Sequence, residues 1–217
     1  MKVLGIDGAL GGFSAAVVSG SAILAKRWAA GNVALEAGLA EVSAVLREAH
    51  AAPQEMDRIA VGCGPGGFTG LRIAISYAKS LAQAWHCPLV AIDSFDLLEF
   101  GGAHDRVLAV VVGRTGVISA RLRDGTRVIR ASGWIADVLD ALSLEGNADP
   151  LPVVGASEDV LSALAERAIA VSPVPSSVTP AACAAALAAS AREPAPSVHA
   201  VRADYGELPA ARVPRLK

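Results

Sequence analysis

The 217-residue sequence is poor in aromatic residues, charged residues and cysteine, and each shortage excludes a class of protein. Aromatic side chains make up 4% of the residues and charged side chains 18%, whereas hydrophobic residues make up 53%. A chain with so much apolar material builds a buried core, which excludes a disordered or coiled-coil protein. The 19 basic and 21 acidic residues nearly cancel. No chain-wide positive field therefore attracts nucleic acid, and any contact with RNA is either local or made through a partner.

The three cysteines and four histidines are too scattered to form a disulfide framework or a common metal site. Cys63, Cys87 and Cys183 are odd in number and include no Cys-x-x-Cys pair, a pattern typical of a reducing compartment. The histidines form neither a His-x-x-x-His nor a His-Glu-x-x-His pair, which argues against a zinc or iron site of that kind. We therefore expect no bound metal and no cofactor.

Long hydrophobic runs are also missing. The apolar stretch at residues 3–6 is interrupted by Asp7 before it reaches the length of a signal-peptide core. No other stretch reaches the roughly 20 residues that cross a bilayer without an interrupting Arg, Glu or Pro. These patterns predict a cytoplasmic protein with no membrane segment.

The sequence does contain an internal repeat. Residues 2–6 (Lys-Val-Leu-Gly-Ile) recur 104 positions later as residues 106–110 (Arg-Val-Leu-Ala-Val), and the same offset aligns Gly12 with Gly116. Both copies have the pattern of three β-strands: a continuous apolar run, as in a strand buried on both faces, and then two strands joined by a tight glycine-containing turn. The repeat therefore predicts two halves of similar structure.

Helices and strands alternate after each group of three strands. This order implies parallel pairing with crossover helices, so each half is predicted to be βββαβαβα, an α/β fold. A glycine-bearing break at residues 101–104 divides the chain into a first domain at 1–103 and a second at 104–217. The sequence leaves open on which half the last helix packs. The predicted helices are 33–50, 69–86, a short one from 94, 134–142, 158–167 and 180–192, and the later strands are 59–61, 89–92, 153–154 and 168–171.

The loop between the first two strands, Asp7-Gly8-Ala9-Leu10-Gly11-Gly12, has the composition of a phosphate site. A carboxylate such as Asp7 at the end of a buried strand can hold a cation, while Gly11 and Gly12 let backbone N–H groups approach anionic oxygens. The alternative is a hairpin turn in which Asp7 accepts hydrogen bonds from nearby N–H groups. The repeat does not reproduce the acid, because Val111 aligns with Asp7 and Arg114 follows it. We therefore expect only a vestigial phosphate loop.

The second glycine-rich loop, residues 62–72, lies between a strand and a helix. Gly62, Gly64 and Gly67 satisfy the spacing Gly-x-Gly-x-x-Gly, and Asp93 ends the next strand, where a ribose-binding acid lies in a Rossmann site. Pro65 removes a backbone donor from the loop, and no Lys-Ser/Thr follows the glycines as in a Walker A loop. A Rossmann-type nucleotide-binding enzyme stays open as an alternative.

Two predicted helices carry more apolar surface than one sheet can cover. In the helix at 69–86 the apolar arc is about twice the ~100° stripe that packs on a sheet. The helix at 33–50 has a predicted core face of Leu35, Leu39, Val42 and Leu46, with small residues opposite. Apolar surface left uncovered in a monomer usually marks an interface. We predict that a partner docks on Val33, Ala37, Ala40, Ala44, Ile73, Tyr77, Ser80, Leu81 and Ala84.

Residues 4–7 (Leu-Gly-Ile-Asp), 64–73 (Gly-Pro-Gly-Gly-Phe-Thr-Gly-Leu-Arg-Ile) and 78–82 (Ala-Lys-Ser-Leu-Ala) together resemble the TsaB (YeaZ) family. The resemblance implies the duplicated actin-like fold (ribonuclease H-like; acetate and sugar kinase/Hsp70/actin). It also implies a role in making tRNA N6-threonylcarbamoyladenosine (A37), in which TsaB pairs with its catalytic paralogue TsaD and helps to recruit the ATPase TsaE. The motif residues of the loop and helix are Gly64, Pro65, Gly66, Gly67, Phe68, Thr69, Gly70 and Arg72.

On this resemblance we expect a non-catalytic subunit that binds and activates a TsaD-like paralogue and helps to recruit a TsaE-like ATPase. The same helices would also suit a homodimer, and tRNA is expected to be reached only through the complex. Gly8, Gly67 and Gly113 depart from the Thr, the Ser and the Asp-Ala-Arg stretch usual in the family, which counts against nucleotide binding. The alternative is an actin-fold ATPase or kinase in which Asp7 positions Mg²⁺ beside a phosphate.

Overall fold

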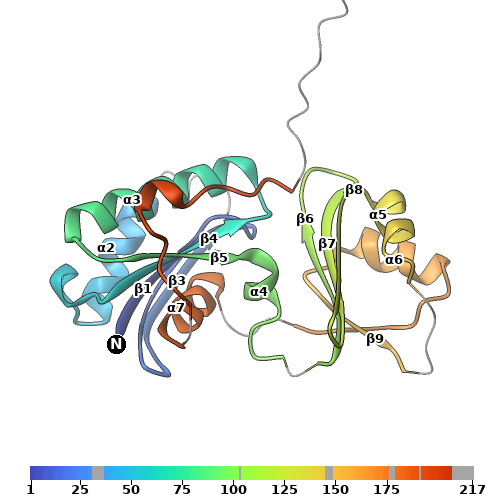
Figure 1. Cartoon of the computed structure of the whole chain (residues 1–217), viewed down its shortest axis with the longest axis horizontal. Helices are drawn as coiled ribbons and strands as arrows, with labels where there is room; N and C mark the ends of the chain where they lie inside the picture. The colour runs from blue at the N-terminus through green and yellow to red at the C-terminus, as the bar shows by residue number, and fades with distance from the viewer. Residues whose placement is uncertain (31–36, 103, 145–148, 176–178, 191, 207–217) are drawn as a thin grey trace, which may run out of the picture.

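The computed structural model describes residues 1–30, 37–102, 104–144, 149–175, 179–190 and 192–206. In this part of the chain the strands form two five-stranded sheets, one in each half of the sequence (Figure 1). The first sheet has the order β3-β2-β1-β4-β5 and the second the order β10-β9-β6-β7-β8. If the strands of each half are numbered one to five from its start, the second order is the first read in reverse. The two sheets therefore have the same strand topology. The predicted duplicated α/β fold is therefore confirmed.

The first sheet is built around β1 (Lys2–Asp7), which pairs antiparallel with β2 (Gly12–Ser19) and parallel with β4 (Arg58–Gly64). Because a strand lies on each side of β1 and helices cover both faces, Val3 and Leu4 are fully buried. The two outer strands of the sheet are β3 (Ala22–Ala30) and β5 (Leu89–Asp93).

The second sheet repeats this arrangement around β6 (Arg106–Val112). The other strands are β7 (Val117–Asp124), β8 (Arg127–Trp134), β9 (Leu151–Val154) and β10 (Val171–Pro173). The predicted position of the last strand, 168–171, is too early. Ala168 instead closes the preceding helix with a positive φ of 57°, and Ile169 turns into the core before β10 begins.

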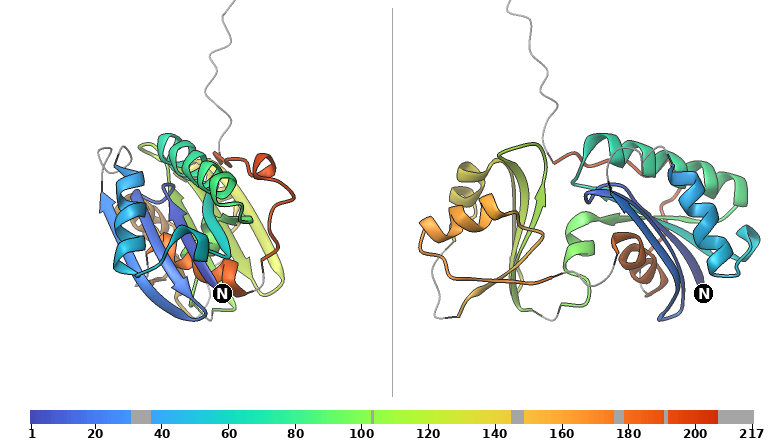
Figure 2. Two further views of the ribbon diagram at one scale, coloured as in Figure 1. Left: turned by 90° about the vertical axis from the view of Figure 1, so that its left-hand side faces the viewer. Right: turned by 180° about the vertical axis from the view of Figure 1, so that it is seen from behind.

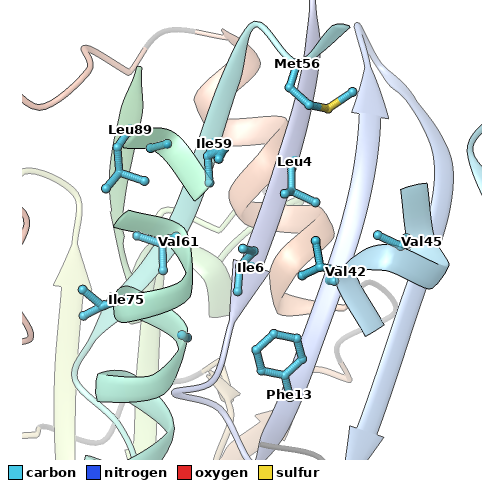
Figure 3. Packing of buried hydrophobic residues seen from close by; sticks show 14 of the residues in the cluster. Leu4, Ile6, Phe13, Val42, Val45, Met56, Ile59, Val61, Ile75 and Leu89 are labelled. Carbon is cyan, nitrogen blue, oxygen red and sulfur yellow. The ribbon is translucent and has the colours of Figure 1, made fainter. Parts of the chain in front are cut away.

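Helices α2 (Gly38–Glu48) and α3 (Phe68–Trp85) cover one face of the first sheet. Figure 3 shows Val42 of α2 beside the strand residues Ile6 and Phe13, and Ile75 of α3 beside Val61. Met56, which follows the short 3₁₀ turn η1 (Pro53–Glu55), lies at the upper end of the same core. The bounds of α3 agree with the prediction of 69–86. In the described residues α2 ends earlier than predicted, at Glu48.

Helix α7 (Pro180–Ser190) covers the opposite face of the first sheet, beneath β1, β2 and β4 (Figure 2). A Cβ atom on Gly5 would lie 1.9 Å from the carbonyl oxygen of Ala181, so the helix approaches the strand as closely as backbones allow. The predicted boundary at 103/104 therefore separates the two sheets but not the helices, because α7 returns to the first sheet. Among the described residues, no helix is both long and apolar enough to span a bilayer.

Among the described residues, the second sheet has helices of its own on one face only. These are α5 (Ile135–Ala141) and α6 (Glu158–Glu166), which share a core with Leu108, Val110 and Ile118. The other face meets α4 (Ser94–Leu98), whose Phe95 packs against Val107 and Ala109. The short helix α4 therefore lies between the two sheets (Figure 1).

A cluster of ion pairs joins the two lobes around α4. The guanidinium of Arg121 on β7, which is 7% exposed, lies 2.7 Å from Asp96 Oδ1 and 2.9 Å from Glu99 Oε1. Arg130 on β8 lies 2.8 Å from Asp93 Oδ2. Basic residues of the second sheet thus pair with acidic residues at and after the end of the first.

Candidate functional site

Asp7 ends β1 at the first glycine-rich loop and is almost completely buried. Its Oδ2 accepts hydrogen bonds from the N–H groups of Ala9 (3.1 Å) and Leu10 (3.2 Å), as in the predicted hairpin alternative. Its Oδ1 is buried and has no hydrogen-bond partner in the described part of the chain. Burial disfavours the charged form and raises the pKa of Asp7 from 3.8 to about 6, although the two hydrogen bonds act in the opposite direction.

The two glycine-rich loops pack directly on each other. The N–H of Gly67 donates to the carbonyl oxygen of Ala9 at 3.0 Å. A Cβ atom on Gly8 would lie 2.5 Å from the Gly70 carbonyl oxygen, and one on Gly66 would lie 2.6 Å from the Ala9 oxygen. Glycine at these positions is thus required by contact between the loops.

The remaining residues of the predicted phosphate loop lie at its rim. Gly11 is exposed and has a φ of 84°, a conformation that favours glycine. A Cβ atom on Gly12 would lie 2.4 Å from the carbonyl oxygen of Ala29 on β3, so this glycine is needed for the approach of β2 and β3. In the second lobe Val111, which occupies the place of Asp7, is 3% exposed. This half provides an apolar side chain where the first provides a carboxylate.

The C-terminal segment, residues 201–206, covers the second glycine-rich loop, a contact that was not predicted from the sequence. The N–H of Asp204 donates to the carbonyl oxygen of Cys63 at 2.7 Å, and a Cβ atom on Gly64 would lie 2.0 Å from the Asp204 oxygen. Tyr205 packs against Phe68, with ring centres 4.9 Å apart. Gly206 reaches the second lobe, where a Cβ atom would lie 2.2 Å from Ser119 Oγ. The segment therefore bridges the lobes.

The Rossmann alternative does not fit this arrangement. The loop belongs to a mixed sheet with antiparallel β1 and β2, not to the parallel sheet of a dinucleotide-binding unit. Asp93, the predicted ribose-binding acid, accepts a hydrogen bond from the Phe95 N–H at 2.8 Å and caps α4. Its other oxygen pairs with Arg130. Both oxygens of Asp93 are thus used within the protein.

One side of α3 carries a row of apolar residues that the rest of the described chain covers only in part. Ile73, Tyr77 and Leu81 are half-buried there, at the edge of the core. The ring of Tyr77 meets Phe13 edge-on with centres 6.2 Å apart, and it leaves no room for a Cβ atom on Gly38, which would lie 2.7 Å from the ring. Towards the start of α3 the surface opens into a pocket of about 380 Å³, lined by Phe68, Thr69, Arg72, Ile73, Ser76 and Tyr77.

The predicted partner residues differ in exposure. Ala40, Ser80 and Ala84 are exposed, whereas Ala37 and Ala44 are half-buried like Ile73 and Tyr77. Val33 and Leu35 lie outside the described residues. Leu39 was predicted in the core and is 47% exposed, because α2 turns Gly38, Val42, Val45 and Leu46 towards the sheet. Glu41 and Glu48 of α2 pair with Arg27 of β3. At 100° per residue Leu39 lies on the opposite side of the helix from both acids, and therefore on the side away from β3.

Within the described residues, no group of three or more His, Cys, Asp or Glu side chains is placed to hold a metal ion. Burial raises the pKa of the Cys63 thiol to about 11, and that of Cys183 likewise to about 11. Both side chains are therefore thiols rather than thiolates at neutral pH, and thiols are poor nucleophiles.

Comparison with known proteins shows similarity to proteins of tRNA threonylcarbamoyladenosine biosynthesis. The family described as TsaD, tRNA N6-adenosine threonylcarbamoyltransferase, matches residues 35–143. The tRNA threonylcarbamoyladenosine biosynthesis protein TsaB of Bacillus subtilis is 38% identical over 63 residues, which are 29% of this chain and 28% of that protein. The match thus spans less than a third of that relative's length.

Two solved structures have the same fold. YeaZ from Pseudomonas aeruginosa superposes with a TM-score of 0.66 at 23% identity, over 86% of this chain and 90% of that one. A protein described as similar to peptidase YEAZ from Pseudomonas aeruginosa gives a TM-score of 0.72 at 21% identity, over 95% and 99% of the two chains. The likeness extends over both lobes.

Proposed function

The chain belongs to the TsaB/YeaZ family of tRNA threonylcarbamoyladenosine biosynthesis proteins, and we propose that it serves there as a non-catalytic subunit that binds and activates a TsaD-like paralogue. The observation that carries this proposal is the incomplete burial of apolar side chains on α3 and α2, beside the pocket at the start of α3. The apolar residues Ile73, Tyr77 and Leu81 of α3 are only half-buried within the monomer, and Leu39 of α2 is 47% exposed. Apolar surface of this kind is typical of a docking site for another protein.

A paralogue with the same fold is the partner that this surface suits best. It would present two helices of matching shape, which can pack side by side with α2 and α3 as in a helical bundle. An interface of ordinary size, about 1,200–2,000 Å² in total, would bury these side chains completely. A second copy of this chain meets the same geometric requirement, so a homodimer would compete with the heterodimer for one surface.

The arrangement of the loops supports a role without catalysis. A nucleotide held between two actin-like lobes needs acidic, glycine-rich hairpins that leave space for phosphates and a cation. Here Oδ2 of Asp7 is bonded to its own hairpin, the two glycine-rich loops fill the space against each other, and Val111 replaces the second acid. The chain would thus act on its partner, and the recruitment of a TsaE-like ATPase would follow from the surface that the pair forms together.

The experiment is a titration of the TsaD-like paralogue into this protein by isothermal calorimetry. Ile73→Arg places an unpaired charge in the apolar interface and is expected to weaken binding roughly 100-fold. Val128→Arg, which places the same charge at a 53% exposed apolar position on β8 of the second lobe, is the matched control and should bind like the wild type. Equal binding by both variants would contradict the docking surface.

One observation favours a second function. The buried Oδ1 of Asp7 has no hydrogen-bond partner in the described chain, as in a site that awaits a cation or a phosphate-bound water. This is the actin-fold ATPase or kinase alternative. Under that reading the purified protein hydrolyses ATP with Mg²⁺, and Asp7→Ala abolishes the turnover; under our proposal neither protein turns over ATP.

A further inference from the structure

Each lobe carries an exposed aromatic ring with an arginine against it. Phe68, the first residue of α3, is 54% exposed, and the guanidinium carbon of Arg72 lies 5.1 Å from its ring centre. Trp134, the last residue of β8, is 55% exposed, and the guanidinium carbon of Arg114 lies 5.1 Å from its ring centre. Each pair thus combines a flat ring with a positive charge at the surface.

The C-terminal segment connects the two pairs across the lobe boundary. Tyr205 packs on Phe68 and also lines a small cavity with Val117 of the second lobe. Val117 is the strand neighbour of Trp134, so Tyr205 connects the Phe68 ring to the strand pair that carries Trp134. In Figure 1 the start of α3, the C-terminal segment and the end of the second sheet next to it lie along the upper side of the molecule.

The chemistry of these pairs matches unpaired nucleotides. Bases that are not stacked in a duplex bind to aromatic faces and to flat guanidinium planes, and the charge of arginine also attracts the phosphates. Asp204 is the acidic residue of the bridging segment, and its Oδ1 accepts a hydrogen bond from the Gly206 N–H at 2.8 Å. The same segment carries the exposed Arg202, and with Arg72 and Arg114 the basic residues named here outnumber this acid, which favours an anionic ligand.

We propose that the Phe68–Arg72 and Trp134–Arg114 pairs form one stacking surface for an unpaired loop of tRNA. The choice of tRNA rests on the proposed function, because the relatives' names refer to tRNA modification. The inference goes beyond the expectation that tRNA is reached only through the complex. It requires no basic character of the whole chain, since stacking provides much of the affinity and two arginines provide the local charge.

The test measures binding of a fluorescent RNA hairpin of anticodon stem-loop length to the full chain, by anisotropy at low salt. The competitor is the same stem without unpaired nucleotides. Trp134→Ala is expected to weaken binding of the hairpin roughly tenfold, the usual cost of removing a stacking ring, and Trp134→Tyr should restore most of the affinity. Trp28 is the matched control, because it is 54% exposed on the edge strand of the first sheet, and Trp28→Ala should change nothing.

Three results would overturn the inference: no binding of the hairpin by the wild type, equal binding of the hairpin and the bare stem, or equal losses with Trp134→Ala and Trp28→Ala. The same variants are then tested in complex with the TsaD-like paralogue. If the complex forms but its affinity for the hairpin is unaffected by Trp134→Ala, the stacking surface is refuted and the proposed function stands. If the chain binds the hairpin through Trp134 but does not bind the paralogue, the proposed function fails and the stacking surface stands.

Discussion

Arg121 is the residue whose removal should most clearly disturb the joint between the lobes. It lies on β7 with 7% of its surface exposed, and its guanidinium contacts carboxylates of Asp96 and Glu99 at 2.7–3.0 Å. It also lies over the ring of Phe95, 5.2 Å from the ring centre. Arg121→Ala removes the central cation of the cluster and leaves carboxylates of the first lobe without their nearest partner.

The cost can be estimated from the contacts that remain. Removing one partner of a buried ion pair typically costs about 3–5 kcal/mol, because the other charge stays buried and unpaired. Here Arg123 still reaches Glu99 at 3.0 Å and Arg192 still pairs with Asp96, so we expect the lower end of this range, about 3 kcal/mol. Arg121→Met, which keeps the packing on Phe95 but not the charge, should lose nearly as much.

The free energy of unfolding is measured by urea denaturation with a circular-dichroism readout. Arg127→Ala is the matched control, since Arg127 is exposed on the neighbouring strand, and it should change stability by no more than about 0.5 kcal/mol. A loss below about 1 kcal/mol for Arg121→Ala would refute the reasoning that this arginine is a buried connection between the lobes.

Three further results follow from the loops and the C-terminal segment. The pKa of Asp7 is about 6 in the folded protein and 3.8 for an unperturbed aspartate, so the folded state binds more protons between these pH values. The free energy of unfolding should therefore fall as pH rises from about 4 to 6, by about 3 kcal/mol in all. This part of the pH profile should be absent in Asp7→Asn. Gly8→Ala should destabilise by about 2–3 kcal/mol, since its Cβ would lie 2.5 Å from a backbone oxygen, whereas Gly67→Ala, with 3.8 Å of clearance, should be close to neutral in thermal denaturation. Gly64→Ala should release the C-terminal segment, because the new Cβ would lie 2.0 Å from the Asp204 oxygen at a φ of 109°; faster proteolysis after Ser197 would report this, and unchanged proteolysis would contradict it.

The two sheets could be predicted from the sequence because each half starts with an apolar strand buried on both faces, at a constant offset. The helix α3 could be predicted for a similar reason, since its apolar and polar residues separate clearly around the helix axis. The strand at 168–171 was placed too early, because an apolar run does not show where the chain leaves a helix. In the structure Ala168 lies in the turn that follows α6, and β10 begins only at Val171.

The position of α7 could not be predicted, because alanine residues occupy every side of this helix. Such a helix has no distinct apolar face, so its sequence does not indicate which sheet it covers. The packing of the C-terminal segment on the second glycine-rich loop could not be predicted for another reason. It depends on backbone atoms, such as the Asp204 N–H and the Cys63 oxygen, and a pattern of side chains does not indicate such contacts. The outward position of Leu39 depends on where α2 starts, and helix ends are the least certain feature of a sequence pattern.

The exposure of side chains on α2 and α3 in the complex tests the docking surface most directly. Hydroxyl-radical footprinting measures how fast individual side chains are oxidised in the free protein and with the TsaD-like paralogue bound. Our account predicts that oxidation of Leu39, Tyr77 and Leu81 slows strongly in the complex, while that of the exposed Ile23 and Trp28 on β3 does not change. Unchanged oxidation of Tyr77 and Leu81 in a complex that has formed would contradict it.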